Sequence, residues 1–160
     1  MADVSALSHV RPLLYHVVMG PARYTMILVA MAFVLGLAAA QSTTSVWDGV
    51  YSDQQAGRGA ALYQTACASC HGDKLQGKGQ TPALTGSDFV MNWSGMTVAD
   101  LFDKIQTSMP ADKPGSLSRE QNASLVAYLL SVNKFPSGKA ELSSDAEHLR
   151  QIRLEATPAK

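Results

Sequence analysis

Two cysteines and a histidine stand close together in the stretch CASCH, where Cys67 and Cys70 are three positions apart and His71 follows directly. The chain has 2 cysteines in all, so neither thiol has a further cysteine to pair with. Thiols at this spacing serve three kinds of chemistry: a redox-active disulfide, a metal site built from side chains, and covalent attachment of a cofactor. The flanking sequence separates these three hypotheses.

A redox-active disulfide of the thioredoxin type follows a strand and opens a helix within a βαβ pattern. The residues before Cys67, QQAGRGAALYQTA, are instead typical of a helix, and no Val/Ile-rich strand precedes them. A structural zinc site needs four ligands. The remaining histidines are His9, His16 and His148, and the first two lie near the N-terminus, so donors are too few.

Covalent haem attachment uses all three side chains. The two thiols add to the two vinyl groups of haem as thioethers, and the adjacent imidazole reaches the iron. The sequence therefore predicts one haem c held by Cys67 and Cys70, with His71 as an iron ligand. A disulfide oxidoreductase remains a remote alternative, which haem retained covalently after denaturation would exclude.

The sixth iron ligand decides between carrying electrons and binding substrate. Met109 stands in the polar stretch QTSMPADKPGSLS, where Pro110 stiffens the backbone and Pro114 with Gly115 indicates a second turn. An apolar side chain has little reason to be there unless something receives it, so Met109 is the expected ligand. We expect Met91 and Met96 to fill the core, as methionines usually do.

The N-terminal residues differ in composition from the rest of the chain. An uncharged run, TMILVAMAFVLGLAAA, follows Arg11 and Arg23 and ends in small residues before Gln41. This layout is typical of a secretory signal, and the run is shorter than the roughly 20 residues of a membrane-spanning helix. We expect a signal peptide at residues 1–40, or an anchor if it is not cleaved, then a linker at 41–52, a domain at 53–135, and a C-terminal extension at 136–160 with a short helix.

The charge pattern and the helix signals limit which folds the part after residue 40 can adopt. The chain has 13 basic and 13 acidic residues with no basic stripe, so nothing indicates nucleic acid binding. Capping residues and apolar periodicity predict helices at about 53–68, 97–108, 118–133 and 145–152. No convincing alternating strand appears. The prediction is an all-α domain of four to five helices around the haem.

With these motifs in place, the chain from about Tyr51 to Asn133 resembles a class I cytochrome c. The resemblance rests on CASCH, MPADKPGSLS and LVAYLLSVN together. It implies that Gly59 and Tyr63 of the first helix meet Leu125 and Tyr128 of the last long helix.

The same resemblance implies three further haem contacts. The carbonyl of Pro82 would accept a hydrogen bond from the proximal histidine, Leu84 would press on the proximal haem face, and Trp93 would bind a haem propionate. An ordinary core tryptophan is the alternative for Trp93.

A narrower similarity runs from Phe89 through Ile152, to cytochrome subunits of quinoprotein alcohol dehydrogenases. It implies a periplasmic, mono-haem electron carrier of the respiratory chain, not itself an enzyme. Its donor would be a quinoprotein dehydrogenase, and its acceptor an oxidase or another cytochrome. Two alternatives stay open: a fixed haem subunit of a dehydrogenase complex, membrane-bound only if the leader is uncleaved, and a ligand-binding or peroxidase-like protein with a labile sixth ligand.

Overall fold

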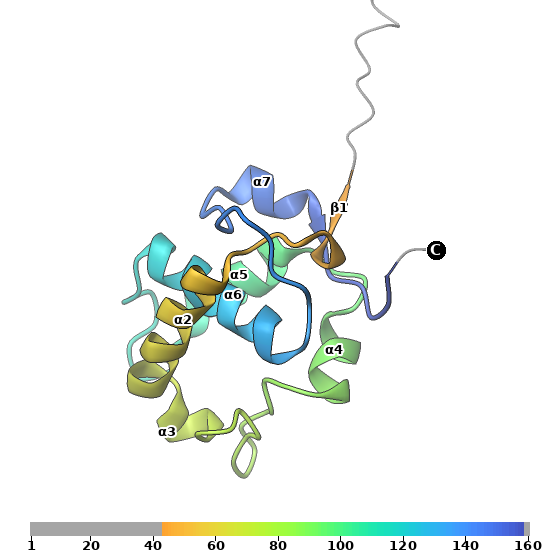
Figure 1. Ribbon diagram of the computed structural model, residues 1–160. Coiled ribbons are helices and arrows are strands. Elements are labelled where there is room, and N and C mark those ends of the chain that lie inside the picture. Colours follow the sequence, from red (N-terminus) through yellow and green to blue (C-terminus); the bar gives the residue numbers. More distant parts are fainter. Residues whose placement is uncertain (1–42, 159–160) are drawn as a thin grey trace, which may run out of the picture. The chain divides into compact units, whose positions relative to one another are not determined.

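The computed structural model describes residues 43–158, so the signal peptide or anchor expected at 1–40 lies outside the described residues. The described part is predominantly helical (Figure 1). No helix within it has the length and apolar character needed to cross a membrane. Its elements in chain order are β1 (Thr44–Ser45), η1 (Val46–Asp48), α2 (Asp53–Ala66), α3 (Ala68–His71), α4 (Ser87–Trp93), α5 (Val98–Ser108), α6 (Arg119–Val132), α7 (Ala146–Arg150) and β2 (Ile152–Arg153).

The four predicted helices are confirmed as α2, α5, α6 and α7, and each begins at a side-chain cap. Ser52 accepts a hydrogen bond from the backbone N–H of Gln55, and Asp145 accepts one from that of His148. Thr97 and Ser118 form reciprocal capping boxes with the third residue of α5 and α6. These bonds satisfy N–H groups that have no partner within the helix. The sequence did not predict α3 as a separate turn, nor α4.

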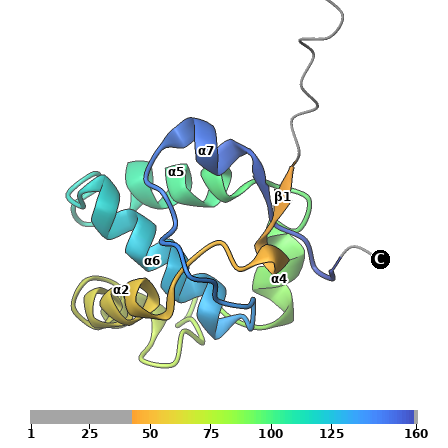
Figure 2. The same ribbon diagram turned by 45° about the horizontal axis from the view of Figure 1, so that its top comes forward.

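The longest helices, α2 and α6, pack against each other (Figure 2). Gly59 makes this crossing close, because a Cβ atom there would lie 1.9 Å from the carbonyl oxygen of Ser124. One turn further along α2, the ring of Tyr63 lies 5.5 Å from the ring of Tyr128. The expectation that a glycine and an aromatic of the first helix meet the last long helix is confirmed by these contacts.

A short sheet departs from the all-α expectation. β1 and β2 pair in parallel, with Thr44 opposite Ile152 and Ser45 opposite Arg153. The indole N–H of Trp47 donates to the carbonyl of Glu155 at 3.0 Å, beside this pair. Strands of two residues carry no alternating pattern, which is why sequence periodicity missed them.

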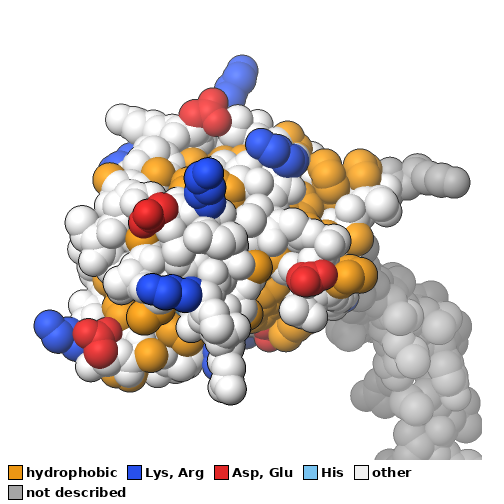
Figure 3. Space-filling view, turned by 90° about the horizontal axis from the view of Figure 1, so that it is seen from below, with side chains coloured by type: hydrophobic (Ala, Val, Ile, Leu, Met, Phe, Trp, Pro, Cys, Tyr) orange, Lys and Arg blue, Asp and Glu red, His pale blue; other side chains and the backbone are white. Residues whose placement is uncertain are grey.

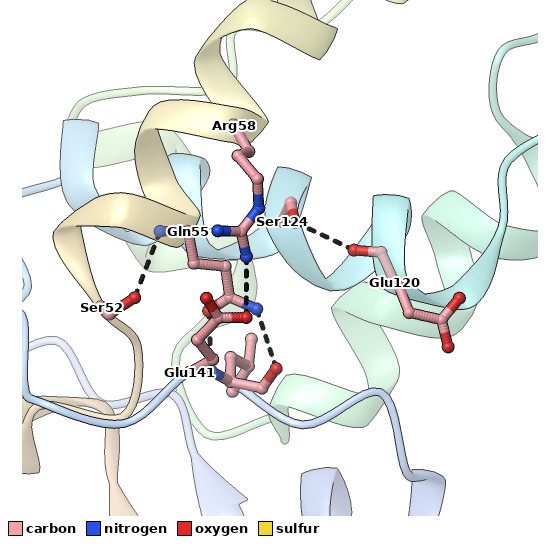
Figure 4. Close-up of polar contacts among 7 residues, drawn as sticks. Ser52, Gln55, Arg58, Glu120, Ser124 and Glu141 are labelled. Carbon is pink, nitrogen blue, oxygen red and sulfur yellow. Dashed lines mark hydrogen bonds and ion pairs between the residues drawn. The ribbon is translucent and has the colours of Figure 1, made fainter.

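The segments expected as a linker and as a C-terminal extension both pack into the fold. Val46 is completely buried and Tyr51 nearly so, so residues 44–51 do not run free as a linker would. The extension is tied to α2, since Gln55 exchanges two hydrogen bonds with the backbone of Leu142 and Arg58 pairs with Glu141 at 2.7 Å (Figure 4). Its buried apolar side chains join the same core as those of α2, α5 and α6; they are Leu142, Leu149, Ile152 and Leu154.

Candidate functional site

A cavity of about 1240 Å³ opens between the end of α2, helices α3, α4, α5 and α6, and the loops that join them. It is larger than the roughly 300–1,000 Å³ of an ordinary small-molecule pocket. Every candidate site residue named from the sequence lines it: Cys67, Cys70, His71, Pro82, Leu84, Trp93 and Met109. The fold therefore gathers into one cavity side chains that the chain spreads over more than forty positions.

The two thiols and the imidazole are brought together by a single helical turn. The backbone N–H groups of Cys70 and His71 both donate to the carbonyl of Cys67, at 3.2 and 3.0 Å. Residues three and four apart in a helix lie on neighbouring positions of its surface, so Cys67 lies close to both Cys70 and His71, and all three side chains line the cavity. Both cysteines are free thiols; Cys67 is half-buried and Cys70 is exposed. Burial, and then the negative charge of Cys70, raise the pKa of the Cys67 thiol to about 11, so it is protonated at neutral pH.

His71 is fixed by a backbone carbonyl. Its Nδ1 lies 3.0 Å from the carbonyl oxygen of Pro82, and the side chain is 8% exposed. Because a carbonyl oxygen only accepts, Nδ1 donates this hydrogen bond, and in the neutral tautomer that does so the lone pair is on Nε2. An imidazole oriented in this way is prepared to bind a metal through Nε2.

The loop after His71 presents Pro82 through a tight turn. The backbone N–H of Gly77 donates to the carbonyl of His71, and that of Leu84 donates to the carbonyl of Leu75. Gly77 has a φ of +74°, and a Cβ atom there would meet the carbonyl oxygen of Thr81 at 2.5 Å. Only glycine fits this approach without strain. The same loop carries Leu84 to the cavity wall.

Met109 reaches the cavity from the end of α5. It is the C-cap of that helix, and its backbone N–H donates to the carbonyl of Ile105 at 2.9 Å. Two turns follow, closed by the bonds from Lys113 to the carbonyl of Pro110 and from Ser116 to that of Lys113. The turn-rich loop expected from the sequence is therefore present, with Met109 at its first position.

Helix α4 supplies another part of the rim. Trp93 is half-buried, and its ring lies 6.3 Å from that of the buried Phe89. The expectation that Met91 and Met96 fill the core is wrong, because they are 65% and 39% exposed. Met96 also lines the cavity.

Most of the residues that line the cavity were not predicted from the sequence as site residues. The apolar part of the lining includes side chains from α4, α5, α6 and the segment before α6, namely Phe89, Leu101, Ile105, Leu117, Leu125 and Leu129. Of these, Leu125 was named only as a helix contact. Their signal in the sequence is the ordinary apolar stripe of an amphipathic helix, which does not tell a core from a cofactor wall.

These residues fit a haem c. Two free thiols for thioether bonds and an oriented imidazole lie on one rim, a methionine sulfur is available from another element, and the walls between are apolar. The surface seen from the side of α3 and the following loop exposes apolar side chains among scattered charges of both signs (Figure 3).

Comparison with known proteins finds similarity to cytochrome-related proteins. Residues 54–129 match the family described as cytochrome c oxidase, cbb3-type, subunit III. The chain is 34% identical over 109 residues to the fructose dehydrogenase cytochrome subunit of Gluconobacter japonicus, an alignment that covers 59% of this chain and 22% of that protein. It is 33% identical over 92 residues to the cbb3-type cytochrome c oxidase subunit CcoP of Azospirillum brasilense, covering 48% of this chain and 30% of that one.

A solved structure is also similar, that of the sulfane dehydrogenase SoxCD from Paracoccus pantotrophus. The TM-score is 0.47 at 26% identity, with 62% of this chain and 52% of that chain covered. The chain spans less than a third of the length of the two curated relatives.

Proposed function

From the premise that residues 54–129 are a cytochrome c domain, we propose that this chain carries single electrons between redox proteins through one haem c. Its relatives are a dehydrogenase cytochrome subunit and a cytochrome c oxidase subunit, which supports an electron-transfer component rather than a catalytic one. The observation that carries the proposal is the shared cavity, with Cys67, Cys70 and His71 on one rim and Met109 on another element.

Each side chain has a distinct task in this proposal. Cys67 and Cys70 hold the cofactor as thioethers, and His71 and Met109 ligate the iron. Pro82 orients His71 through the bond to Nδ1, while Leu84 and Trp93 form the surrounding wall. When bound, haem supplies an iron that gains and loses one electron. His71 and Met109 would both hold the iron, which would leave no place on it for a substrate and favours electron transfer over catalysis.

The setting of this transfer is the periplasm, reached through a signal peptide at residues 1–40. A quinoprotein dehydrogenase is the proposed donor, and a terminal oxidase or another cytochrome the acceptor of the respiratory chain. Both relatives are subunits by name, which keeps a fixed position within a dehydrogenase or oxidase complex as a second candidate. A fixed subunit would copurify with a large partner, and a diffusing carrier would not.

Spectroscopy of the protein and of Met109→Ala tests the ligand set. The ferric protein should show the weak far-red band of sulfur bound to iron, and Met109→Ala should lose it and bind carbon monoxide when reduced. Met91→Ala is the matched control, because Met91 is 65% exposed and does not line the cavity, and this variant should keep the band.

Two results would contradict the proposal. If the unmodified protein lacks the far-red band and takes up carbon monoxide, the sixth position is open and the protein binds ligands or catalyses. If denaturation releases the haem, the thioether assignment of Cys67 and Cys70 is wrong.

A further inference from the structure

We propose that the side-chain amides of Gln106 and Asn122 form a clamp across the base of the Met109 loop, residues 109–117, and so position the Met109 sulfur in the cavity. Gln106 lies in the last turns of α5 and Asn122 in the first turn of α6, the two helices that the loop joins. Neither side chain lines the cavity, so they act through the loop rather than on the cofactor. The inference rests on the proposed ligation by Met109.

The amide clamp is a chain of three hydrogen bonds. Asn122 Nδ2 donates to the carbonyl oxygen of Phe102 at 2.9 Å and to Gln106 Oε1 at 3.3 Å. Gln106 Nε2 in turn donates to the carbonyl oxygen of Leu117 at 3.0 Å. The clamp therefore connects the backbone of α5, the first turn of α6 and the last residue of the loop.

The loop depends on this connection more than on its own contacts. Its internal backbone bonds are the two turns at 110–113 and 113–116, and residues 111–116 are exposed. Within residues 43–158, only the side chain of Gln106 hydrogen-bonds to the backbone of this loop. Because Met109 N–H is bonded to Ile105, the start of the loop moves with α5, and the clamp fixes its end to the same helix.

Asn122 is an unusual choice for a purely structural position. It is completely buried, and within residues 43–158 its Oδ1 has no hydrogen-bond partner. A buried acceptor without a partner destabilises a fold, whereas an apolar side chain of similar size would avoid that loss. The amide is therefore explained by what its Nδ2 group does, which is to hold Gln106 in the orientation that reaches Leu117.

Three variants separate the parts of the clamp. Gln106→Glu keeps an acceptor for Asn122 but removes the donor to Leu117, Gln106→Ala removes both, and Asn122→Leu removes the donor to Gln106 along with the unpaired oxygen. Gln55→Ala is the matched control. Gln55 is also a glutamine whose side chain hydrogen-bonds to a loop backbone, at Leu142 (Figure 4). It is buried, and it does not line the haem cavity.

The measurement is the affinity of the ferric protein for imidazole, which must displace Met109 from iron, followed by loss of the far-red band. If the clamp holds Met109, the three clamp variants should bind imidazole about five- to tenfold more tightly than the unmodified protein, as expected for the loss of one or two hydrogen bonds. Gln55→Ala should stay within about twofold, although it loses buried hydrogen bonds too. Asn122→Leu should bind imidazole more tightly although its free energy of unfolding is not lowered. A merely structural role of Asn122 would not produce this combination.

The outcomes are distinguishable. Unchanged imidazole affinity in Gln106→Glu and Asn122→Leu overturns the inference alone, as does an equal change in Gln55→Ala, because the effect would then reflect general stability. If the unmodified protein has no far-red band, the ligation by Met109 is wrong, and the proposed ligand set and the clamp fall together. Should Gln106→Ala fail to retain haem, the other two clamp variants decide.

Discussion

At the scale of single residues, the hydroxyl group of Tyr63 joins α2 to the end of the cysteine and histidine turn. It donates to the carbonyl oxygen of Gly72 at 2.7 Å, directly after His71, and the side chain is 1% exposed. Burial raises the pKa of Tyr63 to about 12, with smaller contributions from the negative charges of Cys67, Tyr128 and Asp73. Burial dominates, so the shift persists when Cys67 is a thioether.

This pKa shift predicts part of the alkaline unfolding. An unfolded tyrosine ionises near 10.0 and the folded Tyr63 near 12, so its stabilising contribution is complete below pH 10 and is lost as the pH rises to about 12. In Tyr63→Phe the free energy of unfolding should therefore fall less steeply across this window. Denaturant titrations of both proteins between pH 8 and 12 measure it, and equal slopes would show that Tyr63 is not responsible.

At the scale of elements, the crossing of α2 and α6 sets the back wall of the site. Gly59 lets the helices approach until a Cβ atom would overlap the Ser124 carbonyl, whereas a Cβ atom at Gly57 would meet nothing within 4 Å. Leu125 and Leu129 of α6 line the cavity from this crossing. The two glycines differ in environment although both lie in one helix.

These glycines give a matched pair of predictions. Gly59→Ala should lower the free energy of unfolding by more than about 2 kcal/mol, because the new methyl group overlaps a helix backbone that cannot move freely. Gly57→Ala should raise it by about 0.5–1 kcal/mol, since alanine is the better helix former. Denaturant unfolding of both variants measures this. A similar change in both would contradict the close crossing.

Local sequence signals predicted the helices that begin at capping residues. Pairings between residues far apart in the sequence were not predicted. The capping residues Thr97 and Ser118 indicated where α5 and α6 begin. Helix α4 follows Gly86, which has no side chain to cap it. The pairing of β1 with β2 joins opposite ends of the described chain and leaves no local pattern. At the site, the spacing of Cys67, Cys70 and His71 was readable in the sequence. The link between Gln106 and Asn122 was not, because it exists only once α5 and α6 are packed.

At the scale of the whole described chain, the two end segments are part of the core around the site. The backbone of Leu154 exchanges hydrogen bonds with Gly95 and Met96, directly after α4, at 2.8 and 2.9 Å. Leu149 of α7 is completely buried. The C-terminal segment therefore packs as part of the domain and supports α4, the helix that contains Trp93.

Leu149→Ala tests this integration. It should lower the free energy of unfolding by about 2–5 kcal/mol, as for other buried leucines. The haem absorbance should follow the same single transition as tryptophan fluorescence. His148→Ala, at an exposed position of the same helix, should change stability by less than about 0.5 kcal/mol. If Leu149→Ala lowers the free energy of unfolding only slightly, or if the haem absorbance and the fluorescence change in separate transitions, the C-terminal extension is not part of the core.

We propose that the whole molecule transfers one electron at a time through a single haem held at Cys67, Cys70 and His71. A potentiometric titration of the visible spectrum tests this. We predict one transition with a slope of about 59 mV for a tenfold change in the ratio of oxidised to reduced protein. Its amplitude should correspond to one haem per chain. A transition of about 30 mV per tenfold change, the two-electron value of a dithiol and its disulfide, would contradict one-electron transfer by haem, as would the absence of a haem spectrum.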